Sequence, residues 1–99
     1  MNRADVIARL KAAEPALRTR GVASLYLYGS YARDEAGVDS DIDVLIELDR
    51  SADPGLGGYM APYLYLEESF PEAAIGYSTQ EGLVSLYRPY VEQEAIRVF

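Results

Sequence analysis

The chain has 99 residues, with nine Lys and Arg, sixteen Asp and Glu, no His and no Cys. This length predicts a single domain over residues 1–99. The composition excludes a disulfide, a thiolate nucleophile, an imidazole metal site and a Ser-His pair, so carboxylate, hydroxyl, phenol and guanidinium groups remain for chemistry.

The charge and hydropathy of the chain predict its kind of partner and its location in the cell. A formal net charge of -7 argues against direct binding to nucleic acid, whose affinity comes mainly from Lys and Arg, and favours a basic protein partner. No apolar run is long enough to cross a bilayer, and the first residues lack the apolar core of a signal peptide. We therefore expect a cytoplasmic protein without membrane contact.

Residues 2–20 predict a helix, because apolar residues recur at three- and four-residue steps from Val6 to Leu17. Pro15 lacks an amide hydrogen, which predicts a kink or a new start within this segment. Gly21 is the expected end, because glycine takes up left-handed geometry at low cost.

The next segment predicts two strands joined by a short helix and a turn. Residues 23–28 are rich in Leu and Tyr and stop at Gly29, which is typical of a buried strand entering a tight turn. A short helix is expected over 31–36, followed by a turn at 37–40. Alternating apolar residues then predict a strand over 41–48.

Predicted helices and strands also alternate in the second half of the chain. Its predicted elements are a loop at 50–58, a helix over about 59–70, a strand at 73–77, a helix that starts with capping-box spacing at Ser78 and passes Tyr87, and a final strand at 95–99. Helices that alternate with strands around one short sheet predict an α/β, or α+β, domain.

The informative motif is Gly29-Ser30, ten residues, and then Asp41 and Asp43. Because successive strand side chains point to opposite faces, the two aspartates share a face. Adjacent carboxylates repel, and a divalent cation between them or a proton on one of them relieves the repulsion. Gly29 permits close approach to a ligand, and Ser30 opens a short helix whose amides face an anion. The pattern predicts a nucleoside triphosphate with Mg²⁺, the aspartates holding metal and the Gly-Ser pair facing the phosphates.

This motif and its spacing resemble the signature of the polymerase β-like nucleotidyltransferases. Residues 27–33 (Leu-Tyr-Gly-Ser-Tyr-Ala-Arg) and 40–45 (Ser-Asp-Ile-Asp-Val-Leu) look like the minimal (MNT) members of that family, and the order of elements is similar over nearly the whole chain. The resemblance implies a short mixed sheet flanked by helices, a two-metal Mg²⁺ site at Asp41 and Asp43, and ATP as substrate. Such proteins are typically antitoxins that transfer AMP to a tyrosine of a HEPN-domain RNase toxin. The resemblance implies the same partner here, and a hetero-oligomer with it.

One position departs from the family pattern. The family usually carries a third metal-site carboxylate on the following strand, where residues 74–78 read Ala-Ile-Gly-Tyr-Ser and place Gly76. Its loss predicts slower chemistry more than weaker nucleotide binding. Glu67, Glu68 and Glu81 are candidate replacements.

Three functional hypotheses follow. The first is an active adenylyltransferase antitoxin, and the second is a degenerate module that neutralises the toxin by stoichiometric binding alone. The third, transfer to a small hydroxyl compound, is disfavoured because 99 residues leave little room for a second substrate-binding domain.

Several residues have both a structural and a functional interpretation. Arg33 is either a phosphate contact or one half of a surface ion pair with its acidic neighbours. Ser40 is expected to brace the turn before the second strand. The tyrosines are expected mainly to pack in the core and at its rim. Among them, Tyr59 and Tyr63, with Met60, are the part of the surface expected to contact a toxin.

Overall fold

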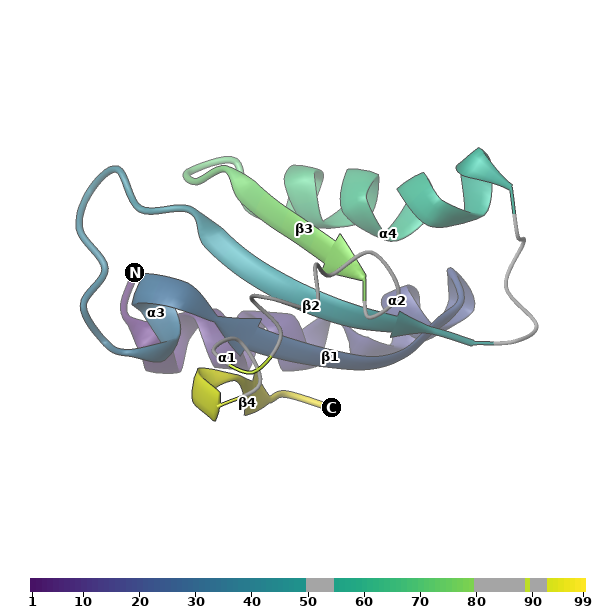
Figure 1. The fold of residues 1–99 in the computed structure, drawn as a ribbon. Helices are drawn as coiled ribbons and strands as arrows, with labels where there is room; N and C mark the ends of the chain where they lie inside the picture. Colours follow the sequence, from purple (N-terminus) through teal and green to yellow (C-terminus); the bar gives the residue numbers. More distant parts are fainter. Residues whose placement is uncertain (50–54, 80–88, 90–92) are drawn as a thin grey trace.

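The structure, a computed structural model, describes residues 1–49, 55–79, 89 and 93–99. Within these ranges the elements follow one another as α1, α2, β1, α3, β2, α4, β3 and β4 (Figure 1). The strands form one mixed sheet in the order β3-β2-β1-β4. The predicted α/β fold with a short mixed sheet is therefore confirmed.

The N-terminal helices meet at the predicted break. Helix α1 (Arg3–Ala12) begins after Asn2, whose side chain accepts a hydrogen bond from the Asp5 amide at 2.9 Å. Helix α2 (Glu14–Thr19) carries Pro15 in its first turn. Proline is tolerated there because its missing amide hydrogen would have had no partner within the helix.

Strand β1 (Val22–Tyr28) pairs antiparallel with β2 (Ile42–Leu48). Helix α3 (Gly29–Ala32) lies between them, so the helix predicted over 31–36 starts two residues earlier and ends four residues earlier. The reason is the backbone of Gly29, whose φ of 76° turns the chain from the strand directly into the helix.

The two outer strands flank the β1–β2 pair. Strand β3 (Ile75–Thr79) runs parallel to β2, and β4 (Ile96–Arg97) runs antiparallel to β1. The strand predicted at 73–77 thus lies two residues later. A helix start at Ser78 was wrong, because Ser78 lies inside β3. The rest of that predicted helix, residues 80–88, is outside the described residues.

Helix α4 (Leu56–Ser69) begins three residues before the predicted start. Two glycines near its beginning favoured a loop, because glycine is a poor helix former. Gly58 is buried in the structure, so tertiary packing overrides that local preference. Residues 50–54 of the predicted loop lie outside the described residues.

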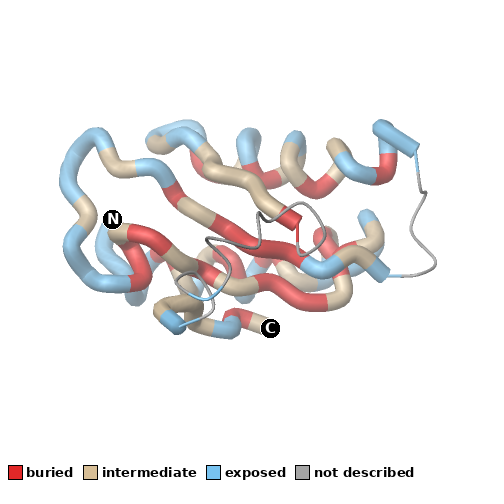
Figure 2. Tube along the Cα trace, in the orientation of Figure 1, coloured by how far each residue is buried: buried red, intermediate tan, exposed pale blue. Residues whose placement is uncertain are grey.

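The hydrophobic core lies between the helices and one face of the sheet. Figure 2 shows buried residues along β1 and β2, the two central strands. Apolar side chains on that face pack against α1, α2 and α4. The fully buried residues of this core, from both the sheet and the helices, are Val6, Leu10, Leu17, Val22, Leu25, Leu27, Ile42, Val44, Ile46, Leu66 and Phe70. Side chains at the alternate positions of the strands face away from the helices. No helix in the described ranges is long and apolar enough to span a membrane.

Candidate active site

Asp43 lies in a row of residues that crosses three strands. The strand register places it beside Tyr28 of β1 on one side and beside Gly76 of β3 on the other. Its neighbours in β2, Ile42 and Val44, are completely buried under the helices. Because side chains alternate along a strand, the Asp43 carboxylate points to the opposite face of the sheet.

Two glycines flank the Asp43 carboxylate. A Cβ atom built on Gly29 would collide with Oδ2 of Asp43, and one built on Gly76 would collide with Oδ1. These built atoms would also lie 3.0 Å and 3.2 Å, respectively, from Cγ of Asp43. The carboxylate therefore spans the space between the two glycines. The halves of the Gly-Ser and Asp-x-Asp motif, distant in sequence, are in direct contact.

The second aspartate acts on the first through its charge. Asp41 is exposed and immediately precedes β2, whereas Asp43 is half-buried. Partial burial raises the pKa of Asp43, and the like charge of Asp41 raises it further. The positive charge of Arg33 opposes this shift in pKa. The structure thus brings together two carboxylates that repel each other when both are ionised.

This pair of carboxylates fits a Mg²⁺ ion that is completed by other oxygen ligands. Mg²⁺ prefers oxygen donors and is often held by one or two carboxylates together with substrate phosphates. Within the described part of the chain, no group of three acidic side chains converges on one metal position. Asp41 and Asp43 would therefore share the ion with a phosphate-bearing ligand.

Glu94 is a site residue that the sequence analysis did not single out. Its carboxylate accepts hydrogen bonds from the Gly29 amide at 3.1 Å and from the Arg33 guanidinium at 3.0 and 3.2 Å. Arg33 also pairs with Glu35 at 3.2 Å, so the ion-pair interpretation of Arg33 describes this structure. Ser30 follows Gly29 in α3 and is half-buried.

Two of the three proposed replacements for the third carboxylate are described, and both lie elsewhere. Glu67 and Glu68 are exposed on α4, which packs on the face of the sheet opposite the Asp43 carboxylate. The carboxylate of Glu67 forms a hydrogen bond with the Tyr63 hydroxyl, which raises the pKa of Tyr63. Glu81 is outside the described residues. Gly76 itself lies beside Asp43 in the strand register, where a carboxylate on β3 would join the pair.

The tyrosines near α4 form a packed cluster. Tyr77 contacts Tyr59 and Tyr63 edge-on, with ring centroids 5.4 and 5.6 Å apart. Its hydroxyl donates a hydrogen bond to the Tyr59 carbonyl at 2.9 Å, and burial raises its pKa. These rings therefore have a packing role, and their contact with a toxin stays a prediction.

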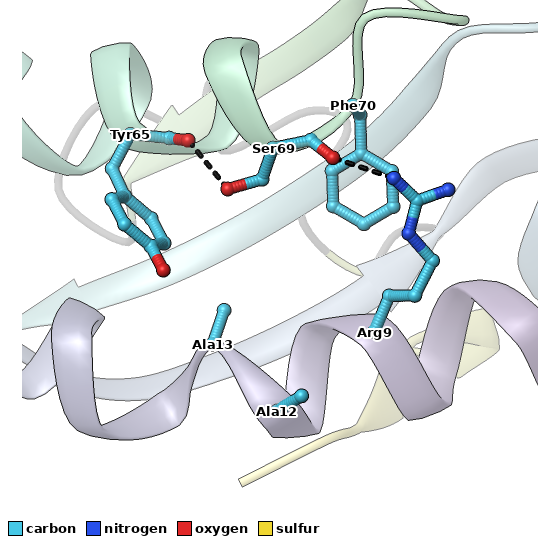
Figure 3. A pocket seen from close by; sticks show the side chains of 6 residues that line it. All are labelled: Arg9, Ala12, Ala13, Tyr65, Ser69 and Phe70. Atoms are coloured by element: carbon cyan, nitrogen blue, oxygen red, sulfur yellow. Dashed lines mark hydrogen bonds between the residues drawn. The ribbon is translucent and has the colours of Figure 1, made fainter.

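A cavity of about 250 Å³ lies away from the motif, between α1 and α4 (Figure 3). Arg9 donates a hydrogen bond across it to the Ser69 carbonyl at 2.5 Å and pairs with Glu72 at 2.9 Å. The same guanidinium stacks over the Phe70 ring at 4.3 Å from its centroid. Because the charge of Arg9 is already paired, this cavity is a packing gap between two helices and not a candidate anion site.

The order of elements and the motif geometry agree with the comparison to known proteins. The model of the nucleotidyltransferase domain family matches residues 10–97, which include both halves of the motif. The chain belongs to this family. The domain is 35% identical over 72 residues to the "Putative protein adenylyltransferase MJ1379" of Methanocaldococcus jannaschii, a match that covers 73% of this chain and 68% of the relative.

Solved structures show the same fold. A "Structure of putative minimal nucleotidyltransferase" superimposes with a TM-score of 0.80 and 28% identity, covering 97% of this nucleotidyltransferase domain and 95% of that chain. A toxin-antitoxin structure with AMP-PNP gives a TM-score of 0.69 at 15% identity, covering 100% of this chain and 73% of that one. A mutant of the toxin-antitoxin MntA-HpeT gives 0.65 at 13% identity, with the same coverage. The chain is a minimal nucleotidyltransferase, and the last two similarities show the fold alone.

Proposed function

We propose that this minimal nucleotidyltransferase binds Mg²⁺ and ATP and transfers AMP to a tyrosine of a partner protein, a HEPN-type RNase toxin that it neutralises. The observation that carries the proposal is the contact between the Asp43 carboxylate and Gly29, which joins the metal-holding and phosphate-facing halves of one motif. The adenylyltransferase name of the relative supports AMP as the transferred group. The toxin-antitoxin neighbours support the class of partner.

The chain's own residues have distinct tasks in this reaction. Asp41 and Asp43 would hold Mg²⁺, which when bound would supply positive charge opposite the phosphates and the leaving pyrophosphate. The Gly29 amide and Arg33 orient the phosphates, so that the tyrosine oxygen approaches the α-phosphorus in line with the leaving group. A bond forms between that oxygen and phosphorus, the bond to the β-phosphate breaks, and the hydroxyl proton passes to water.

A second candidate function rests on Gly76. The residue lies beside Asp43 in the sheet and supplies no carboxylate. A site with only two carboxylates can bind nucleotide yet transfer it slowly, because the general base and one metal ligand are missing. In that case the domain neutralises its partner by occluding it in a stoichiometric complex.

Mass spectrometry separates the two functions. The candidate toxin is any HEPN protein found to be encoded in a neighbouring reading frame, and it is incubated with this domain, ATP and Mg²⁺. Transfer adds AMP units to the toxin, and an Asp43→Asn variant adds none. If the unmodified toxin is silenced, and a variant with both Asp41→Asn and Asp43→Asn still silences it, occlusion is the function.

A further inference from the structure

Glu94 holds the donor groups that face the phosphates in the proposed function. The Gly29 amide and the Arg33 guanidinium both donate to its carboxylate, at distances from 3.0 to 3.2 Å. Backbone amides and guanidinium groups are the protein donors that bind phosphate oxygens. The carboxylate of Glu94 thus binds where an anionic ligand oxygen would bind.

The position of Glu94 follows from the last strand. Ile96 of β4 pairs with Leu27 of β1, two residues before Gly29. This pairing brings Glu94, which lies two residues before β4, next to the end of β1. The Glu94 side chain is 32% exposed. The carboxylate can therefore leave its donors by a side-chain rotation, without disturbing the core.

Glu94 does not act as a third metal ligand in this arrangement. No three acidic side chains among the described residues converge on one metal position. The negative charge of Glu94 acts on Asp43 by repulsion, since it contributes to raising the pKa of Asp43. The positive charge of Arg33 offsets that repulsion. Glu94 is thus bound as a substitute anion beside the acidic pair.

We propose that Glu94 is an internal competitor for the triphosphate: its carboxylate occupies the Gly29 and Arg33 donors in the free protein and is displaced when nucleotide binds. This inference rests on the proposed function, because it assigns the displaced position to the phosphates of the same nucleotide. Competition from Glu94 makes the affinity for nucleotide lower than the Gly29 and Arg33 donors alone would give. The ligand class is a polyphosphate anion, with or without a nucleoside.

The test is calorimetric titration of the full chain with two probes, inorganic tripolyphosphate without metal and ATP with Mg²⁺. Glu94→Gln keeps the size of the side chain and removes the charge that competes. We expect it to bind both probes about three- to tenfold more tightly than the unaltered protein. Equal or weaker binding of both probes by Glu94→Gln overturns the inference.

Glu35→Gln is the matched control. It removes the same charge and also an acceptor for Arg33, at 3.2 Å, but the Gly29 amide donates its hydrogen bond to Glu94 and not to Glu35. We expect it to change either affinity by less than about twofold, as for an exposed ion pair. An equal gain in affinity in both variants would mean that removal of any nearby negative charge has this effect, and it would overturn the competitor role. If Glu94→Gln is unstable, an NMR titration of the unaltered protein with tripolyphosphate replaces it. We expect the Gly29 amide resonance to shift, and an unshifted resonance at saturation overturns the inference.

The outcomes also separate this inference from the proposed function. If the unaltered protein binds Mg²⁺ and ATP but Glu94→Gln brings no gain, the competitor role fails and the function stands. A second outcome is that Glu94→Gln binds tripolyphosphate more tightly, while the affinity for ATP is independent of Mg²⁺ and unchanged in Asp43→Asn. The proposed function then fails and the competitor role stands. Absence of polyphosphate binding in both proteins contradicts both.

Discussion

The carboxylate of Asp43 leans over Gly76 of the neighbouring parallel strand, so that Oδ1 fills the space where a Cβ of residue 76 would lie. A side chain at position 76 is therefore accommodated only if Asp43 turns its carboxylate away. Because the colliding atom is the end of a flexible side chain, this rotation is cheap. Position 76 is thus open to a carboxylate at the cost of a new Asp43 rotamer.

Gly76→Asp tests whether the missing carboxylate limits transfer. We expect AMP transfer to the partner to rise by about tenfold or more, because a general base and metal ligand is restored. Gly76→Asn has the same volume without the charge and should bring no gain. The initial rate of AMP addition, followed by mass spectrometry, gives the measurement. An equal rate in Gly76→Asp and the unaltered protein would show that this position does not complete the site.

Gly29→Ala should damage both folding and binding. The φ of 76° at this residue is unfavourable for alanine, and the new Cβ would collide with Asp43. We expect unfolding free energy to fall by about 1–2 kcal/mol, together with loss of nucleotide binding. Gly37→Ala is the control, since a Cβ there meets nothing within 4 Å. Urea denaturation showing similar stability for the two variants would contradict this reading of the turn.

Asp43→Asn should stabilise the metal-free protein near neutral pH. The pKa of Asp43 is raised in the folded state, so the folded state holds this proton more tightly than the unfolded chain. Stability is therefore lost as pH rises from the ordinary pKa of aspartate, 3.8, through the raised pKa. The asparagine variant avoids that loss, so it should be more stable than the unaltered protein at pH 7, and this difference in stability should disappear towards pH 4.

The matched control for this stability effect is Asp39→Asn, which makes the same charge change in the exposed turn before β2. It should leave the free energy of unfolding nearly unchanged. Urea denaturation in a metal chelator at both pH values gives the measurement. A destabilised Asp43→Asn protein at neutral pH would mean that the carboxylate is needed for the fold.

Local patterns predicted the parts of the site that depend on a few consecutive residues. The alternation around Ile42 placed Asp43 on the face away from the core, and Gly29 marked the turn at the end of β1. Both follow from backbone geometry that the sequence encodes locally. The short helix after Gly29 was misplaced because the positive φ of that residue starts the helix at once.

The parts of the site that depend on long-range pairing could not be predicted in the same way. Glu94 is 65 residues from Gly29 and reaches it only through the pairing of β4 with β1. The collision of a Gly76 side chain with Asp43 likewise depends on the parallel register of β2 and β3. The early start of α4 depends on the burial of Gly58, which local propensity opposes.

The central claim is that Asp41 and Asp43 hold a metal together with the phosphates of a nucleotide beside Gly29. Titration of the protein with ATP, with and without Mg²⁺, tests it most directly when amide resonances are followed by NMR. We expect binding that requires Mg²⁺, shifts the amides of Gly29 and Asp43, and weakens by about tenfold or more in Asp43→Asn. Binding that is unchanged in Asp43→Asn, or that leaves both amides unshifted, would contradict the claim.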